Sequence, residues 1–284
     1  MKRILSLFFL LIPFALHAQI EETDAEDNST SAEMEADEQA QPGYDELIFE
    51  RATNGDVEAQ LLLAKTFDFG KPEQINKEEA VRWYAAAAEQ GNAEAQYYLS
   101  THLYTGDGVQ RSIQQALKWC RNAAESGYDR AQYTMGVCYA QGLGVTKSPA
   151  DAAQWWLKAA EQGNADAQCE LGVYYSKEDD TDASPEEAAK WFRMSAEQGN
   201  ARAQAYLGKC YYDGEGVKKS YQEAVKWLRL AANKGNHHAL NNLGVCYQHG
   251  QGVEQNETEA IRLFRLSARQ GNKLAKHNLE ALGQ

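Results

Sequence analysis

Five cysteines and six histidines are the side chains of this chain that could act as nucleophiles or hold a metal ion. The cysteines are Cys120, Cys138, Cys169, Cys210 and Cys246. An odd number of thiols leaves at least one free or paired outside the chain. Three of them precede a tyrosine at multiples of 36 residues, where an apolar residue would serve equally, so we interpret them as buried small hydrophobic side chains. Only Cys120 with Cys138 is a pair that we would test for a disulfide.

The chain lacks the short motifs that place a catalytic nucleophile or a zinc ion. It has no Ser-x-x-Lys, no Lys-Thr-Gly and no His-Glu-x-x-His. His237 and His238 are adjacent on a predicted helix and should face different ways, and His249 falls in a predicted turn. No recognisable set of metal ligands results. The sequence predicts a protein that is not an enzyme and needs no cofactor or metal.

A fixed spacing of glycines defines the elements that must position these side chains. Seven glycines recur every 36 residues, at Gly55, Gly91, Gly127, Gly163, Gly199, Gly235 and Gly271. A constant period of about 20 to 50 residues indicates one supersecondary unit stacked on copies of itself. Fold and binding surface are therefore set repeat by repeat.

The second half of each repeat carries strong helix start signals. A favoured N-cap residue stands 21 residues after each of the first six glycines: Asn76, Ser112, Ser148, Ser184, Ser220 and Asn256. An acidic residue or glutamine follows three residues later, as in a capping box, and Pro149 and Pro185 take the first helical position. The next glycine is predicted to end this helix in a left-handed conformation.

A tryptophan stripe is predicted to form the core of these second helices. The stripe comprises Trp83, Trp119, Trp155, Trp191 and Trp227, with Leu263 in the last copy. An alanine stands three residues before each of them, which lets neighbouring helices approach while the indoles fill the space between hairpins. Burying a large apolar side chain contributes roughly 1.5–3 kcal/mol, so a core is favoured over a carbohydrate-binding platform.

The first half of each repeat follows the pattern of residues 200–211, and it is predicted to be a helix. A turn of the form Gly-x-Gly-Val follows at residues 106–109, 142–145, 214–217 and 250–253. Glycine supplies backbone angles that other residues resist, and the valine can hold the loop against the core. The first and fourth repeats depart from this turn. Residues 45–54 and 273–282 read as single helices that cap the two ends.

These residues together resemble the Sel1-like repeat family. The matching motifs are Ala-x-Ala-Gln-x-x-Leu-Gly, Gly-x-Gly-Val, Ala-x-x-Trp and Ala-Ala-Glu-Gln-Gly-Asn, and they cover about residues 44–282. The resemblance implies an all-α fold of tetratricopeptide type. In such a fold, residues 44–284 form a right-handed α/α superhelix, or solenoid, of six 36-residue helical hairpins with half-repeat caps.

The resemblance also implies a function. The family is known for protein binding, and its exported bacterial members are linked to envelope processes or host contact. We therefore expect a non-catalytic scaffold or adaptor that binds a protein or peptide on its concave face. A cysteine-rich branch has been associated with penicillin binding or hydrolysis, but this chain has alanines where that branch has paired cysteines. A β-lactam-directed enzyme and a self-assembling structural component stay open as alternatives.

In superhelices of this type the first helices line the concave face, which implies where a partner would bind. Positions three, six, seven and ten after each glycine are expected to point there. The partner-binding residues predicted in this way are Tyr97, Tyr98, Arg130, Tyr133, Arg202 and Tyr206. Tyrosine and arginine are enriched among residues that carry binding energy. The alternative is that some of these tyrosines only pack against the adjacent hairpin.

The N-terminal residues predict export. Lys2 and Arg3 precede an apolar run that ends at Ala18, so residues 1–18 are expected to be a cleavable signal peptide. Residues 19–43 are expected to be an acidic disordered linker, because they hold nine Asp or Glu and no Lys or Arg. No later apolar run is long enough to enter a membrane. We expect a periplasmic or secreted protein that does not bind nucleic acid, since no basic patch is visible.

Overall fold

The computed structural model describes residues 44–72, 74–177 and 183–284, where α-helix is the only regular secondary structure. The first seven helices are α2 (Tyr44–Thr53), α3 (Val57–Phe69), α4 (Lys77–Glu89), α5 (Ala93–Thr105), α6 (Ile113–Glu125), α7 (Asp129–Gln141) and α8 (Pro149–Glu161). The others are α9 (Ala165–Tyr175), α10 (Pro185–Glu197), α11 (Ala201–Asp213), α12 (Tyr221–Asn233), α13 (His237–His249), α14 (Glu257–Arg269) and α15 (Lys273–Ala281). The predicted signal peptide and acidic linker lie outside the described residues.

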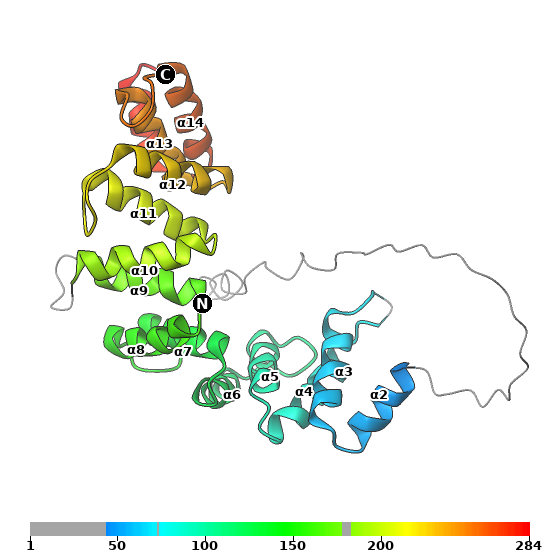
Figure 1. Cartoon of the computed structure of the whole chain (residues 1–284). Helices are drawn as coiled ribbons and strands as arrows, with labels where there is room; N and C mark the ends of the chain where they lie inside the picture. Colours follow the sequence, from blue (N-terminus) through cyan, green and yellow to red (C-terminus); the bar gives the residue numbers. More distant parts are fainter. Residues whose placement is uncertain (1–43, 73, 178–182) are drawn as a thin grey trace, which may run out of the picture.

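The helices form a single-file stack. Each helix packs against the next one in the chain, and Figure 1 shows the hairpins following one another along a bent path. Helix α2 is the half-repeat at one end, six hairpins run from α3–α4 to α13–α14, and α15 closes the other end. The prediction of an all-α solenoid of six helical hairpins with half-repeat caps is confirmed. Among the described residues, no helix is long and apolar enough to cross a membrane.

The helix boundaries follow from local signals. All six predicted second-helix N-caps accept a hydrogen bond from the backbone N–H three residues later, as Ser148 does from Asp151 at 3.2 Å. The seven repeat glycines adopt positive φ after each second helix. Gly216 shows why the turns also need glycine: its φ is +66°, and a Cβ there would lie 1.9 Å from the Pro185 carbonyl oxygen.

The core is built by a row of residues, all large except Cys120, each one position after the predicted tryptophan stripe. This row comprises Tyr84, Cys120, Trp156, Phe192, Leu228 and Phe264, and all six are buried. Of the stripe itself, Trp83, Trp191 and Trp227 are buried, whereas Trp119 and Trp155 are only half-buried. Those two residues pack against the core without being fully buried in it.

Each member of the core row faces a small residue on the first helix of its own hairpin. The small residues are Ala64, Ser100, Gly136, Gly172, Gly208 and Gly244. A Cβ added to Gly172 would lie 2.4 Å from the Phe192 ring, and one added to Gly136 would lie 2.4 Å from the Trp156 ring. Because interiors are close-packed, Trp156, Phe192, Leu228 and Phe264 as placed here leave no room for a Cβ at the glycine opposite, whereas Tyr84 is accommodated with Ala64.

Buried glutamines tie successive hairpins together. Gln60, Gln96, Gln132, Gln168 and Gln204 each donate a hydrogen bond to an alanine carbonyl of the preceding second helix. In three repeats a glutamine after the next second helix donates in turn to the side-chain oxygen of this buried glutamine at 2.8 Å. Buried polar atoms need such partners, so these glutamine hydrogen bonds fix the register between successive repeats.

Candidate functional site

The predicted partner-binding residues lie on neighbouring first helices and interact across repeats. We call Tyr98, Arg130, Tyr133, Glu170, Arg202 and Tyr206 the first-helix face. Arg130 Nη1 lies 3.5 Å from the Tyr98 hydroxyl, and Arg202 forms an ion pair with Glu170. Burial, with the charge of Glu170, raises the pKa of Tyr133. These contacts link α5 to α7 and α9 to α11, and the influence of Glu170 on Tyr133 connects the two pairs.

The expectation that position six after each glycine is accessible is wrong for five of the six repeats. Leu61, Tyr97, Cys169, Ala205 and Asn241 are all buried. Tyr97 is only 8% exposed, and its ring packs against Tyr98 and Tyr128 at centroid distances of 5.7 and 5.3 Å. Tyr133, at the same position, is half-buried. Tyr97 is therefore a core residue, whereas Tyr98 is partly exposed at the surface.

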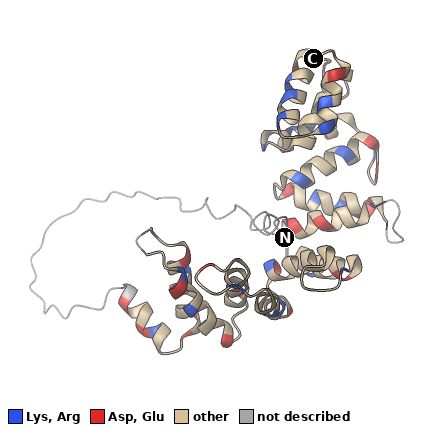
Figure 2. Cartoon of the chain, turned by 180° about the vertical axis from the view of Figure 1, so that it is seen from behind, with Lys and Arg blue, Asp and Glu red and all other residues tan. Residues whose placement is uncertain are grey.

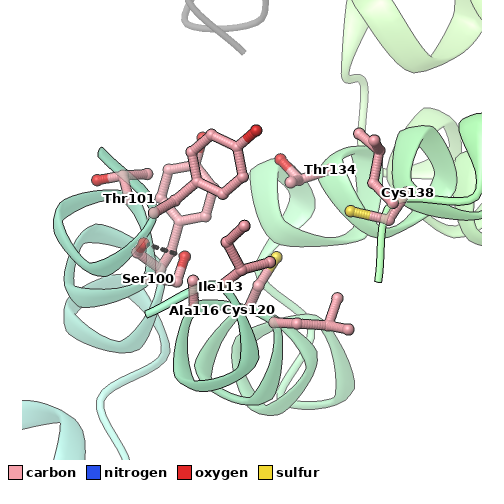
Figure 3. Close-up of a pocket in the computed structure, with 11 residues that line it drawn as sticks. Ser100, Thr101, Ile113, Ala116, Cys120, Thr134 and Cys138 are labelled. Carbon is pink, nitrogen blue, oxygen red and sulfur yellow. Dashed lines mark hydrogen bonds between the residues drawn. The ribbon is translucent and has the colours of Figure 1, made fainter. Parts of the chain in front are cut away.

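A pocket opens where α5, α6 and α7 meet. We call it the junction pocket, and it is lined by Tyr97, Ser100, Thr101, Tyr104, Ile113, Ala116, Leu117, Cys120, Thr134, Cys138 and Leu143. Its volume is about 40 Å³. Figure 3 shows Ser100 and Thr101 on one side, Thr134 and Cys138 across from them, and Ile113, Ala116 and Cys120 below. The pocket lies where Cys120 replaces the large core residue of the other repeats.

The junction between α6 and α7 departs from the repeat pattern at three further positions. Tyr128 takes the N-cap of α7 without a capping hydrogen bond, whereas the other first helices are capped by Asn or Asp. Ser126 stands where three other repeats carry the inter-repeat glutamine, and the Gln96 side-chain oxygen has no hydrogen-bond partner among the described residues. The same holds once more in the stack, where Lys234 replaces the glutamine and the Gln204 side-chain oxygen is without a partner among the described residues. Arg130 replaces the acidic residue of its neighbours Glu94 and Asp166.

These departures lower stability, so packing does not explain them. A missing N-cap costs about 1 kcal/mol. An unpaired buried polar atom costs roughly 1–3 kcal/mol. Real sequences break such local rules most often at functional sites. The candidate site is therefore the junction pocket together with the nearby residues Tyr98, Tyr128 and Arg130.

The tyrosine hydroxyls of this site stay protonated at neutral pH. Burial raises the pKa of Tyr97 to about 12. Burial also raises the pKa of Tyr98 and of Tyr128. The hydroxyls can therefore donate hydrogen bonds beside the Arg130 guanidinium, which suits an anionic or carbonyl-bearing ligand.

The cysteines do not form a reactive set. All five are unbridged and buried, including Cys120 and Cys138. Burial raises the pKa of Cys138 to about 11 and that of Cys169 to about 12, and it also raises the pKa of Cys120. A thiol is a poor nucleophile when its thiolate is disfavoured. The interpretation of these thiols as buried small hydrophobic side chains fits this burial.

The orientation of two adjacent histidines differs from the prediction. The rings of His237 and His238 lie 4.0 Å apart between centroids, so the prediction that they face different ways is wrong. Burial, with the neighbouring His237, lowers the pKa of His238. Over the described part of the chain, no three His, Cys, Asp or Glu side chains are grouped so that they could hold a metal ion.

A buried polar network beside the candidate site fastens the first two hairpins to each other. Asp68 accepts hydrogen bonds from Lys77 Nζ at 2.6 Å and from the Tyr84 hydroxyl at 3.2 Å. His102 Nε2 lies 3.1 Å from Asp68 Oδ2, and His102 Nδ1 lies 2.8 Å from the Asp107 carbonyl oxygen. Both ring nitrogens face acceptors, which favours the doubly protonated imidazolium.

This network makes stability depend on pH. Burial opposes charge on both groups, but their mutual hydrogen bond and charge prevail, so the pKa of Asp68 is lowered from 3.8 and that of His102 is raised from 6.5. The Asp68 contribution is present above pH 3.8 and is lost as the pH falls through its lowered pKa. The His102 contribution is present below pH 6.5 and is lost as the pH rises through its raised pKa.

We expect His102→Cys, the residue of three equivalent repeats, to lower the melting temperature most between pH 4 and 6.5. As the pH rises to 9, wild type loses the stabilisation that charged His102 provides, so the difference in melting temperature between the two proteins should shrink. Each kcal/mol of stabilisation lost should reduce that difference by about 2–4 °C. Thermal melts of both proteins across this range provide the measurement. A difference that stays constant with pH would show that His102 is neutral in the folded protein.

Sequence reasoning missed the pocket and the exposed ring of Phe69, whereas Leu62 is at position seven after Gly55 and was expected on the concave face. Leu62 and Phe69 on α3 are 41% and 50% exposed, and Phe69 packs edge-on against Tyr98 at 5.6 Å. The signal for the pocket was present, because Cys120 and Tyr128 each interrupt a row of equivalent residues. Figure 2 shows basic and acidic residues interspersed along the stack.

Comparison with known proteins agrees with this architecture. The Sel1 repeat family matches six times in succession, at residues 57–92, 93–128, 129–164, 165–200, 201–236 and 237–272. A Sel1 repeat protein from Oxalobacter formigenes is 30% identical with a TM-score of 0.68, over 79% of this chain and 91% of that protein. A comparison with proteins of curated function finds no match.

A protective antigen of uropathogenic Escherichia coli strains with an SLR fold is also similar. It is 33% identical with a TM-score of 0.73, and the match covers 83% of this chain. The chain spans only 50% of the length of that antigen. The two solved structures share the solenoid with this chain.

Proposed function

The chain belongs to the Sel1 repeat family, and we propose that it binds a protein or peptide on the first-helix face, around the junction pocket. Sel1 repeats commonly serve as protein-interaction scaffolds, and proteins of the family are generally non-catalytic. The first-helix face is proposed to be the concave face of the stack. In support, α11 contacts the first helices α9 and α13 on either side of it, and elements on the inside of a curve crowd together.

One observation carries this proposal. Cys120 lines the junction pocket, and three further residues that differ from those of neighbouring repeats, Ser126, Tyr128 and Arg130, follow within ten residues of it. A repeat selected only for stacking would keep the capping Asn or Asp and the large core residue here, as the other repeats do. Aromatic and arginine side chains around a small apolar pocket are typical of the centre of a protein interface.

We also propose that the protein acts in the periplasm or outside the cell. The support is the basic, apolar and small-residue pattern of residues 1–18. The mature N-terminus, determined by mass spectrometry of the protein isolated from its own cells, tests this. A chain that begins after residue 18 is expected, and a chain recovered intact from the cytosol would refute export.

Partner capture tests the binding function. Tagged wild-type protein and Tyr98→Ala are compared in the native cells by crosslinking and quantitative mass spectrometry. We expect a partner that Tyr98→Ala reduces by about tenfold or more, because truncating a central aromatic commonly costs at least 1–2 kcal/mol of binding. Tyr211→Ala is the control, since Tyr211 is equally half-buried but bonds Arg193 of the second helix α10.

The melting temperature of each variant decides how the capture is interpreted. Capture lost by Tyr98→Ala with a melting temperature near that of Tyr211→Ala supports the site. Capture retained by Tyr98→Ala, or lost equally by both variants, would contradict it.

A further inference from the structure

Arg130 differs from the other basic residues of the first helices. Helices α3, α5, α7, α9, α11 and α13 carry four Lys or Arg residues in all. Lys65 pairs with Glu94 at 2.8 Å, Arg202 pairs with Glu170, and Lys209 pairs with Asp213 at 2.9 Å. Arg130 has no carboxylate partner within the described parts of the chain, and its guanidinium lies 3.5 Å from the Tyr98 hydroxyl.

The carboxylates closest to Arg130 along the first helices are already held by other groups. Glu94 binds Lys65, and Asp129 accepts a hydrogen bond from Asn164 Nδ2 at 2.8 Å. Asp166 accepts one from Asn200 Nδ2 at 2.8 Å. Arg130 is nevertheless half-buried. A partly desolvated guanidinium gains more from an ionised acceptor than an exposed one does.

Donors and an apolar hollow flank this guanidinium. The Tyr98 hydroxyl lies beside it, and Tyr128 forms a hydrogen bond with Tyr98. Thr134 follows Arg130 by one turn of α7 and lines the junction pocket. Figure 3 shows Thr134 across the pocket from Thr101, above Cys120 and Ala116. A carboxylate at Arg130 would therefore place the next part of a ligand at the pocket mouth.

We infer that the junction binds an extended acidic peptide segment of the partner. Arg130 and the tyrosine hydroxyls hold an Asp or Glu side chain, and the junction pocket takes a small apolar side chain next to it. The pocket is small and mainly apolar in its lining, which suits a small apolar side chain. This inference rests on the proposed binding function and names the chemistry of the partner.

A displayed library of random linear peptides, joined through their C-termini, provides the test. It is selected on the full-length mature protein, on Arg130→Gln and on Cys120→Met, with Arg193→Gln as control. Arg193 also contacts a tyrosine hydroxyl, Tyr211 at 2.7 Å, but lies on the second helix α10. We expect wild type and Arg193→Gln to select peptides with an acidic residue beside a small apolar one.

Arg130→Gln is expected to lose the acidic preference but keep the apolar one, and Cys120→Met, which fills the pocket, to do the reverse. A synthetic selected peptide should lose about 10- to 100-fold in affinity for wild type when its acidic residue becomes the amide, the usual effect of a hydrogen bond to a charged group. Selected peptides without acidic residues, or equally acidic on Arg130→Gln, would overturn this inference alone. No peptide selected on any variant would overturn the proposed function with it.

Discussion

Ser100→Gly combined with Cys120→Phe is expected to close the junction pocket and lower partner binding by about 30-fold or more, with folded stability near that of wild type. The pair reproduces Gly172 with Phe192, where the phenylalanine ring packs directly against the glycine. Filling about 40 Å³ gains roughly 1 kcal/mol at ~24 cal/mol per Å³ of cavity. Glycine within a helix costs about as much. The binding loss follows from removing the pocket at the centre of the site.

The single variants sharpen this prediction. Cys120→Phe alone should destabilise the protein by about 1–3 kcal/mol, because the Ser100 side chain occupies the space that Gly172 leaves free beside Phe192. Chemical denaturation of both single variants and the double variant gives the coupling between the two positions. If Cys120→Phe is as stable as the double variant, the Ser100 side chain does not obstruct a phenylalanine at position 120. If the double variant binds as wild type does, the pocket is not part of the site.

Asp68→Ala is expected to lower the free energy of unfolding of the first two hairpins by about 3–5 kcal/mol, the usual effect of removing one member of a buried ion pair. Asp68 is 4% exposed and serves three partners, which are Lys77, Tyr84 and His102. Without the carboxylate, the buried Tyr84 hydroxyl and His102 ring lose their acceptor. Denaturation, with hydrogen exchange read helix by helix, provides the measurement.

The control is Asp213→Ala, because Asp213 pairs with Lys209 at the surface and such pairs contribute about 0.2–1 kcal/mol. In a solenoid each repeat contacts only its neighbours, so faster exchange should be confined to α3–α6. Exchange that quickens equally in α11–α15, or an Asp68→Ala variant as stable as Asp213→Ala, would contradict the role given to this network.

The sequence predicted the solenoid well because its signals are local. An N-cap such as Ser148 and a glycine such as Gly163 act within one helical turn, so each boundary could be predicted without knowing the neighbouring repeats. It was harder to predict which of two adjacent apolar residues on a helix faces the core. Trp155 and Trp156 are both apolar, and adjacent helical residues point about 100° apart, so periodicity alone did not show that Trp156 is the buried one.

The same one-residue ambiguity affected the site. Tyr97 and Tyr98 were both predicted to face a partner, but only Tyr98 reaches the surface, because Tyr97 turns toward Cys120 and Met135 in the core. Arg130 and Arg202 lie on first helices, as their repeat positions predicted, and their role in partner binding stays a prediction. The pocket could not be predicted from one residue type, because it results from Ser100 and Cys120 being small together.

Site-specific photocrosslinking in the native cells tests the central claim most directly. A photoreactive amino acid replaces Thr101 at the pocket mouth in one protein and the exposed Lys190 on the second helix α10 in another. Our account predicts one partner band that forms at Thr101, is absent at Lys190 and disappears when Arg130→Gln is added. A partner that crosslinks at Lys190 and not at Thr101 would contradict binding on the first-helix face.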